Sequence, residues 1–208
     1  MSGLTVWHPG HVDLVVVEGD VAGARSAIAA AELVGEQQEV CRQRFFDLLD
    51  AHGDALVRTC RPGHLTGSSL VVESGAERVL VLWHNKAKRW LQPGGHADGD
   101  GNLPHVAWRE ATEETGIDGL AVVVPAVHVD IHEFRPPDED PHLHFDVRYV
   151  VLAPSGATTQ PNHESGGLRW VTFDELVGLR SDPGLLELAT RGLELARSLD
   201  PDQWPQRP

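Results

Sequence analysis

The sequence predicts an α/β fold, in which a mixed β-sheet is sandwiched between helices, with a mainly helical appendage in front of it. Two observations lead to this prediction. Residues 65–154 contain several β-branched runs separated by turn residues, and residues 184–199 carry apolar side chains at helical spacing. Strands mixed with helical segments are typical of an α/β sandwich.

The first 62 residues differ in pattern from the rest, so we predict an appendage at residues 1–62 and a main domain at residues 63–208. A short turn, Arg61-Pro62-Gly63-His64, marks the boundary. The elements expected in the appendage are a strand at 13–18, an alanine-rich helix at 22–34, and a helix or a helical pair, broken near His52, at 36–59. Three roles remain open for this appendage: contact between the subunits of a dimer, a lid, and structural cover of the main domain.

The main domain begins with strands and ends with a helix. The expected strands are 65–74, 78–85, 121–134, 143–154 and a short one before Asp174; the expected helices are 104–115, one that begins at Asp174, and 184–199. The first two strands form a hairpin around Gly75, and residues 136–142 form a turn-prone acidic loop. We expect the proline-rich tail after Asp200 to fray.

Charge and composition exclude several classes of protein. A formal charge of -14 argues against a nucleic-acid partner, because such proteins need a basic face. It is compatible with small phosphorylated substrates if bound cations reverse the local field. No apolar run approaches the length of about 18 residues that a membrane span needs, and no basic and apolar leader begins the chain, so we expect a cytoplasmic protein. Two cysteines, Cys41 and Cys60, make neither a disulfide framework nor a zinc knuckle.

The acidic helix at 104–115 is the most informative segment. Glu110, Glu113 and Glu114 share one face of it, because positions i, i+3 and i+4 of a helix lie together. Like charges at this spacing destabilise a helix by a few tenths of a kcal/mol, so a purely structural helix would spread them out. Converged carboxylates suit Mg²⁺ or Mn²⁺. A solvated acidic face is the alternative interpretation.

Residues 95–117 resemble the signature box of the Nudix hydrolase family. That box consists of Gly, five residues, Glu, seven residues, and then Arg-Glu-U-x-Glu-Glu-x-Gly-U, where U is a bulky aliphatic residue. The positions that match are Gly95, Arg109, Glu110, Glu113, Glu114, Gly116 and Ile117. Gly101 stands where the family has its first Glu, and Ala111 is a small U. The resemblance implies the Nudix fold, a mixed sheet between helices, over roughly residues 65–200.

The Gly101 departure bears on the order of the loop. In the family, the first Glu supports the loop and the arginine, whereas the later acids hold metal. Asp98 or Asp100 is then the candidate to take over the partnership with Arg109. We also expect Gly101 to tolerate replacement by Glu, because that change restores the arrangement of the family.

The resemblance implies a divalent-metal-dependent hydrolase that cleaves a diphosphate linkage in a nucleoside diphosphate derivative by attack of water on phosphorus. The implied metal ligands are Glu110, Glu113, Glu114 and the backbone carbonyl of Gly94, with Mg²⁺ or Mn²⁺ as the cofactor. Glu113 is either a ligand or the group that orients the attacking water. Arg109 braces the loop.

The resemblance also implies a further acid, on the loop before the Trp-Val-x-x-x-Glu-Leu stretch that begins at Trp170. Glu164 has this position and is the candidate general base. Glu133 and Glu139 are competitors, and an exposed loop glutamate is the alternative interpretation of Glu164.

Histidines and tryptophans supply further candidates, since the chain has 12 and 6 of them. His96 follows the double glycine and either donates to phosphate or caps a turn. Trp90 and Trp170 lie at the ends of strands that should frame the pocket, where they offer base-stacking surfaces. His142 and His144 project to one strand face, where His132 or His163 would complete a zinc site, although two such residues are more often surface or pocket residues.

Two other functions compete with hydrolysis. One is a catalytically weak or inactive Nudix-fold domain that binds a nucleotide or a sugar nucleotide as a sensor, which Gly101 and the unexplained first 62 residues favour. The other is an isopentenyl-diphosphate isomerase, which needs a Cys and Glu pair near the metal, whereas both cysteines precede residue 63. The expected partner is a small molecule, with no nucleic acid and no membrane, and a homodimer is one option for the assembly.

Overall fold

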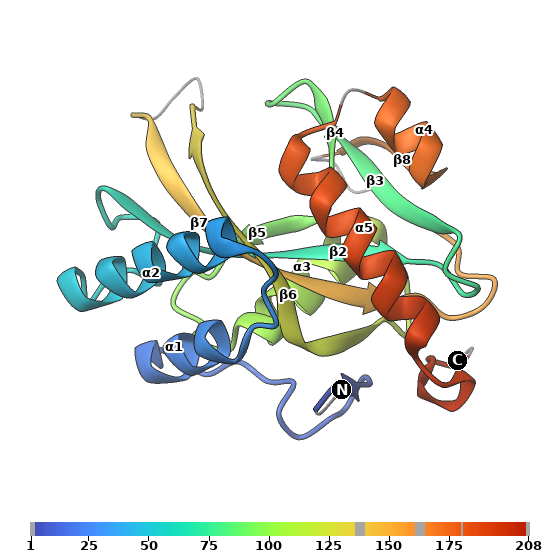
Figure 1. Cartoon of the computed structure of the whole chain (residues 1–208), viewed down its shortest axis with the longest axis horizontal. Helices are drawn as coiled ribbons and strands as arrows, with labels where there is room; N and C mark the ends of the chain where they lie inside the picture. The colour runs from blue at the N-terminus through green and yellow to red at the C-terminus, as the bar shows by residue number, and fades with distance from the viewer. Residues whose placement is uncertain (1–2, 136–139, 161–164, 180, 207–208) are drawn as a thin grey trace.

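One mixed β-sheet forms the centre of the molecule (Figure 1), in a computed structural model that describes residues 3–135, 140–160, 165–179 and 181–206. The strands are β1 (Thr5–Trp7), β2 (Gly63–Val72), β3 (Arg78–His84), β4 (Arg89–Leu91), β5 (Gly94–His96), β6 (Ala121–Phe134), β7 (His142–Leu152) and β8 (Ser165–Thr172). The helices are α1 (Val21–Ala30), α2 (Glu36–Ala51), α3 (Leu103–Thr115), α4 (Phe173–Gly178) and α5 (Pro183–Ser198), followed by a 3₁₀ turn at Pro201–Gln203.

The sheet has the order β1-β6-β7-β2-β3-β4, with β5 paired to β2 and β8 paired to β3. The pair β2 and β7 is parallel, and the other named pairs are antiparallel. All ten residues of β2 are buried. A strand that is covered on both faces needs a continuous run of residues that tolerate burial, and the stretch LTGSSLVV meets this requirement.

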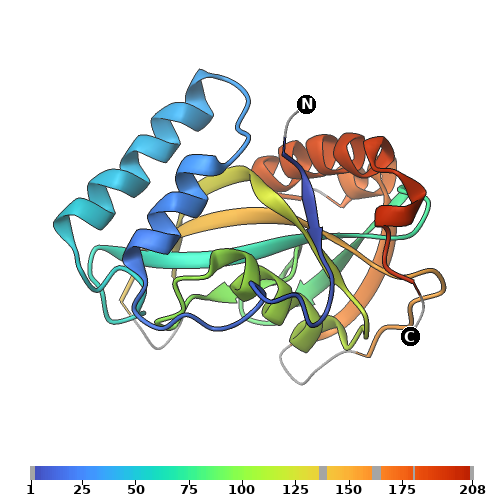
Figure 2. The same cartoon turned by 90° about the horizontal axis from the view of Figure 1, so that it is seen from below.

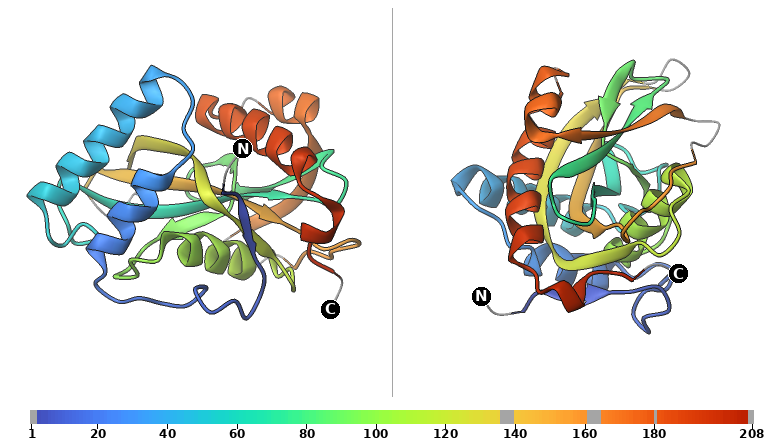
Figure 3. Two further views of the ribbon diagram at one scale, coloured as in Figure 1. Left: turned by 60° about the horizontal axis from the view of Figure 1, so that its bottom comes forward. Right: turned by 90° about the vertical axis from the view of Figure 1, so that its right-hand side faces the viewer.

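Helices cover both faces of this sheet, with α3 on one face and α5 on the other (Figure 3). Under α5, Leu185 and Leu188 pack in one apolar cluster with Leu70 of β2. On the opposite face, α1, α2 and α3 contribute to a second cluster, whose members include Ile28, Phe45, Leu103, Val106, Leu65 and Val71. Segments from both sides of residue 62 therefore bury their apolar side chains in one shared core.

The chain before residue 63 lies against the sheet and α3. Figure 2 shows α1 and α2 side by side at one end of the sheet, and the segment before α1 passing alongside α3. Leu14 of this segment is buried in the α3 cluster, and β1 pairs with residues 122–124 of β6. The first 62 residues thus cover part of the sheet and of α3.

Several of the local predictions are confirmed. The acidic helix α3 ends at Gly116, which has a left-handed φ of 63°, as a glycine after the last turn of a helix should. The strand expected at 121–134 is β6. The closing helix α5 begins after Asp182, whose side chain accepts a hydrogen bond from the backbone N–H of Gly184.

Three predictions were wrong. Residues 13–18 form no strand beyond an isolated bridge from Glu18 to Asp100, because their backbone bonds a glycine-rich loop instead of the sheet. Within 36–59 the helix ends at Ala51, next to the break expected near His52, but turns follow it up to residue 62 in place of further helix, so buried Cys60 lies outside any helix. The tail forms a 3₁₀ turn at Pro201–Gln203 and packs Trp204 on the α5 cluster.

Among the helices within the described residues, none has both the length and the apolar character that crossing a lipid bilayer requires.

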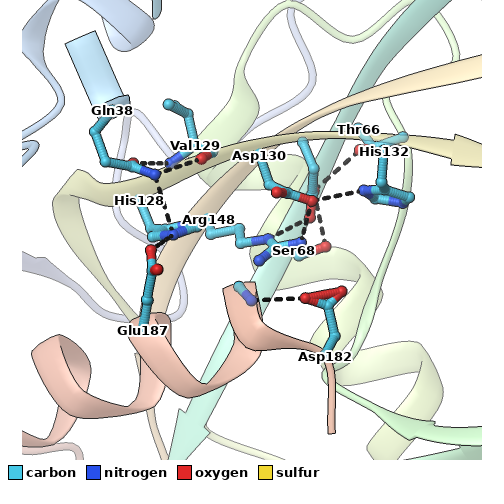
Figure 4. A network of polar contacts seen from close by, with 12 residues as sticks. Gln38, Thr66, Ser68, His128, Val129, Asp130, His132, Arg148, Asp182 and Glu187 are labelled. Atoms are coloured by element: carbon cyan, nitrogen blue, oxygen red, sulfur yellow. Dashed lines mark hydrogen bonds and ion pairs between the residues drawn. The ribbon is translucent and has the colours of Figure 1, made fainter. Parts of the chain in front are cut away.

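A buried polar network joins β2, β6 and β7 (Figure 4). Arg148 is its centre: its Nε donates to Asp146 at 2.7 Å, and its Nη2 donates to Asp130 at 2.8 Å. Asp146 also accepts from the hydroxyls of Thr66, at 3.0 Å, and Ser68, at 2.8 Å. Burial alone would lower the pKa of Arg148, but Asp146 and Asp130 outweigh it and raise that pKa. The network is thus a fully buried cation held by two carboxylates.

We predict that Arg148→Met destabilises the protein by about 3–5 kcal/mol, because it leaves Asp130 and Asp146 buried without their cation. Urea unfolding measures this change in the free energy of unfolding. The control is Arg169→Met, since Arg169 and its partner Glu175 each expose 47% of their side chains and such a surface pair contributes at most about 1 kcal/mol. Equal losses in the two variants would contradict a structural role of the buried network.

Candidate functional site

The acidic face of α3 lies against the backbone of β5. The backbone N–H of Gly94 donates to the Glu114 carboxylate at 2.9 Å, and Glu114 is only 9% exposed. The Glu110 carboxylate lies directly over Gly95, where a Cβ would stand 2.5 Å from it. A side chain at residue 95 would therefore push this carboxylate away, which explains the need for glycine at that position. Glu113, on the same helix, is more open, with 59% of its side chain exposed.

Arg109 is the cation nearest to these acids. Its Nη1 lies 2.7 Å from Glu110 and 3.6 Å from Glu113, and its Nη2 donates to the backbone carbonyl of His96 at 3.1 Å. It therefore braces the loop through a carbonyl, and the expected partnership with Asp98 or Asp100 was wrong. Burial raises the pKa of Glu110, against the opposing effect of Arg109.

Asp98 and Asp100 have other partners. Asp98 pairs with Arg58, whose Nε donates to it at 2.8 Å, and this pair lowers the pKa of Asp98. Asp100 is buried, accepts from the backbone N–H of Val17 at 3.0 Å, and lies 2.7 Å from Nδ1 of His105. Both aspartates thus tie the glycine-rich loop to segments outside the acidic face.

The segment before α1 occupies the space beside Gly101. The N–H of Gly101 donates to the carbonyl of Val17 at 2.9 Å, and the N–H of Gly19 donates to the carbonyl of Gly99 at 2.8 Å. A Cβ on Gly101 would stand 2.2 Å from the backbone oxygen of Asp20. The expectation that Gly101 tolerates Glu was therefore wrong, because backbone fills the place where that side chain would begin.

The residues of the acidic face fit a divalent cation. The three carboxylates share this face with one guanidinium, that of Arg109, which contacts Glu110 and Glu113, so two negative charges are left over when all of these groups are ionised. Burial raises the pKa of Glu110, which means that the contacts within the protein do not fully offset the cost of burying its negative charge. The donors are oxygen atoms, which Mg²⁺ and Mn²⁺ prefer.

A cavity of about 490 Å³ opens beside this face. Gly94, Gly95 and Glu114 form part of its wall, and Asp146 and Arg148 of the buried network also line it. Cationic side chains line it as well, and they are Lys86, Arg89 and Arg135. The cavity therefore places positive side chains and the acidic face around one volume, as a phosphate-bearing ligand requires.

None of Lys86, Arg89 and Arg135 was predicted from the sequence as a site residue. A signal was present, because Lys86, Lys88 and Arg89 form a basic run just before the glycine-rich loop. In a chain with a formal charge of -14, such a run stands out.

The tryptophans do not take the positions that we expected. Among the described residues that line the cavity, neither Trp90 nor Trp170 occurs. Arg89 and Leu91 line it, so the alternation of side chains along β4 turns Trp90 to the opposite face, where it packs against Trp83 with ring centroids 5.7 Å apart. Trp170 packs against the core cluster under α3. The ring that faces the cavity is instead that of Phe134.

Of the candidates for the further acid, Glu133 lines the cavity and pairs with Arg135, with 2.6 Å between the charged atoms. Glu139 and Glu164, like His163, lie outside the described residues. His96 lines the cavity and lies close to two other histidine rings, those of His64 and His144.

Comparison with known proteins agrees with this geometry. A family model described as the NUDIX domain matches residues 63–190. Phosphatase NudJ of Escherichia coli strain K12 is 32% identical over 116 residues, which make up 55% of this chain and 71% of that protein. Two solved structures share the fold, each at 14% identity and over 65% of this chain. They are a Caenorhabditis elegans Ap4A hydrolase, with 98% of its chain covered and a TM-score of 0.52, and the E. coli dihydroneopterin triphosphate pyrophosphohydrolase, with 97% covered and a TM-score of 0.50.

We predict that Gly101→Ala destabilises the protein by about 1–3 kcal/mol, the usual cost of overpacking, because its Cβ meets the Asp20 backbone. Thermal unfolding measures the loss, and limited proteolysis detects release of the segment before α1. Gly53→Ala is the matched control, since nothing lies within 4 Å of the added Cβ there. If Gly101→Glu kept the stability of the natural chain, the packing of this segment on the loop would be refuted.

Proposed function

The chain belongs to the Nudix hydrolase family, and on this premise we propose that it uses a divalent cation, Mg²⁺ or Mn²⁺, to cleave a diphosphate linkage in a nucleoside diphosphate derivative. Membership makes it a pyrophosphohydrolase in general terms. The cation and the role of each residue are our inference from the site.

One observation carries the proposal: the acidic face of α3 and a set of cationic side chains border the same cavity. Glu114 contributes the carboxylate that lies in the cavity wall, and Lys86 and Arg89 contribute positive charge to its lining. A diphosphate group carries negative charge along its length, so one part of it can lie near a bound cation while another part contacts these side chains. A purely acidic surface would repel such a substrate.

We assign the cation to Glu110 and Glu114, with Glu113 as a further ligand or as the residue that orients water, and with the backbone carbonyl of Gly94 completing the protein donors. A bound divalent cation supplies a Lewis acid and lowers the pKa of a coordinated water. The protein positions it, because the N–H of Gly94 holds Glu114 at 2.9 Å and Gly95 leaves room for Glu110.

The remaining assignments concern the substrate. Lys86 and Arg89 bind its phosphate oxygens, and His96 contributes a donor to the same groups. The Phe134 ring is the apolar surface in the cavity that suits the moiety linked to the diphosphate. Arg109 positions the loop through the carbonyl of His96 and does not contact substrate.

The geometry gives no reason to prefer a non-catalytic sensor. In the family, the first Glu of the box orders the loop. Here Val17 and Gly19 bond the same loop through their backbones. These bonds support the hydrolase over the sensor, because they order the loop that lacks the Glu of the family at Gly101, and the three carboxylates of α3 are present.

We predict that Glu114→Gln and Glu110→Gln each lower turnover by at least about 100-fold, because each removes a charged ligand while keeping the side-chain shape. The assay is hydrolysis of ADP-ribose, dinucleoside polyphosphates, NADH, CTP and oxidised purine triphosphates, with and without Mg²⁺ or Mn²⁺. Glu77→Gln is the matched control, because Glu77 is an exposed glutamate between β2 and β3. Full turnover in Glu114→Gln, or turnover without any divalent cation, would refute the proposal.

The general base is tested by three parallel variants, Glu164→Gln, Glu139→Gln and Glu133→Gln. We propose Glu164, and predict that its replacement lowers kcat by about 100-fold or more with little change in KM, while the other two variants stay close to the natural enzyme. The rate should rise with pH through the pKa of the base, because the base must be ionised. If Glu164→Gln left kcat unchanged, Glu164 would not be the base, and the role would pass to Glu139 or Glu133, whichever replacement lowers kcat.

A further inference from the structure

Four histidines from three strands, β2, β5 and β7, meet at the end of β5 where His96 lies. His64 is the second residue of β2, His96 ends β5, and His142 and His144 lie at the start of β7. The strand register explains the meeting: His64 is the direct partner of His144, and His96 is the partner of Thr66, two residues after His64. Four potential ligand nitrogens, one from each ring, lie within 4.8 Å of one another.

Buried nitrogens in this cluster lack partners. Neither ring nitrogen of His64, which is 1% exposed, makes a hydrogen bond to any described residue, and the same holds for Nε2 of His144. Buried polar atoms are normally satisfied, so each exception needs an explanation. Three unsatisfied nitrogens that belong to two neighbouring rings point to a ligand-binding function of those rings.

Burial favours the neutral form of two of the four rings, those of His64 and His144. Burial lowers the pKa of His64 to about 4, with further lowering by His96 and His142, whereas the backbone of Cys60 acts weakly in the opposite direction. Burial, followed by the neighbouring histidines, lowers the pKa of His144 to about 2. A neutral imidazole has a nitrogen lone pair and no positive charge, so the cluster is suited to a cation and poorly suited to an anion such as phosphate.

His142 shows how one ring is oriented. Its Nδ1 lies 2.9 Å from the backbone carbonyl of Asp140, to which it donates. That hydrogen bond places the proton on Nδ1 and leaves the lone pair on Nε2. Metal-binding histidines in proteins have the same arrangement, in which the second nitrogen donates to a carbonyl or a carboxylate.

We propose that His64, His96, His142 and His144 bind one Zn²⁺ ion in a tetrahedral site made of four imidazoles. Nitrogen ligands at 2.0–2.1 Å from a tetrahedral ion stand about 3.3 Å apart. The ring nitrogens here are up to 4.8 Å apart, so they must approach one another by at most about 1.5 Å when the ion binds. Rotation of the ring torsions covers such a change. Four nitrogen donors in a tetrahedron favour Zn²⁺ over Cu²⁺ and Ni²⁺, which prefer square-planar coordination, and over Mg²⁺, which prefers oxygen.

This zinc site is distinct from the acidic face of α3, which offers oxygen donors only. Four protein ligands leave no open position, so the ion is structural and takes no part in the attack of water. It joins β2, β5 and β7 next to the double glycine, because His96 directly follows Gly95. Zinc therefore stabilises the strand on which Glu110 and Glu114 rest, and the site stands whether or not the proposed hydrolysis is correct.

The first test uses the full-length, untagged protein, purified without chelators and dialysed against excess Mg²⁺. We expect elemental analysis to find about one zinc per chain, and X-ray absorption to find imidazole nitrogens at about 2.0–2.1 Å around it. Absence of stoichiometric zinc after addition of Zn²⁺, or a coordination shell dominated by oxygen, would overturn the proposal. Neither readout depends on substrate or on a variant that must fold.

The second test locates the site with variants. Loss of a residue that only supports a metal ligand weakens metal binding by up to about 100-fold. His142→Ala and His144→Ala each remove a ligand itself, so they should weaken zinc binding by more than that, as measured by competition with a chromophoric chelator. His132→Ala is the matched control, since its ring lies 5.4 Å from that of His144 but outside the cluster, and it should bind zinc as the natural chain does. The double variant Glu110→Gln, Glu114→Gln should also keep its zinc.

Equal affinity in His144→Ala and the natural chain, or loss of zinc from the double glutamate variant, would refute the assignment. Should the histidine variants fail to fold, Co²⁺ added to the natural chain replaces them as the probe. Tetrahedral nitrogen coordination gives Co²⁺ an intense visible absorption, which one equivalent of Zn²⁺ should abolish. A weak spectrum of octahedral type would refute the site.

Discussion

The double burial of β2 is the constraint on which the other parts of the structure depend. One edge of this strand pairs with β7 along its whole length, and the other edge pairs with β5 and then with β3. Its backbone groups are thereby satisfied in the interior, where unpaired groups would be costly. Because β2 fixes the positions of β5 and β7, it also sets where the double glycine, the buried Arg148 and the four histidines lie. Thr66 and Ser68 of this strand line the cavity, and α3 packs against the same strand.

The segment before α1 shows how a missing side chain can be replaced by backbone. Gly101 has no carboxylate, and the carbonyl of Val17 accepts its N–H instead. Asn102 donates from its side chain to the carbonyls of Asp13 and Val15, at 2.6 and 2.8 Å, which adds further anchors to the same loop. This packing leaves Val15 and Val17 partly exposed, at 49% and 38%, because their role lies in the backbone bonds. Loop order thus depends on residues that precede the family domain.

The lining of the cavity is less acidic than the chain as a whole, because its four cationic side chains equal its four acidic ones in number. The chain carries a formal charge of -14, yet cationic side chains line the cavity and a buried arginine lies beneath it. Arg148 remains charged because Asp130 and Asp146 contact it directly, and its guanidinium in turn offsets one of their two negative charges. Positive groups nearest to a ligand act most strongly on it, since charges farther than about 10 Å are largely screened by salt. The acidic total therefore does not prevent the binding of a phosphorylated ligand.

The sequence by itself determined the features that arise within one element. The spacing of Glu110, Glu113 and Glu114, the end of α3 at Gly116 and the bounds of β6 follow from helical or strand periodicity, which is local. Tertiary structure decided the features that need two elements: the direction of Trp90 away from the cavity, the partners of Asp100, and the meeting of His64 and His96 with the pair on β7. The physical reason is that periodicity states which face a residue occupies, whereas the choice of neighbouring strands and their register is made by packing across the whole core.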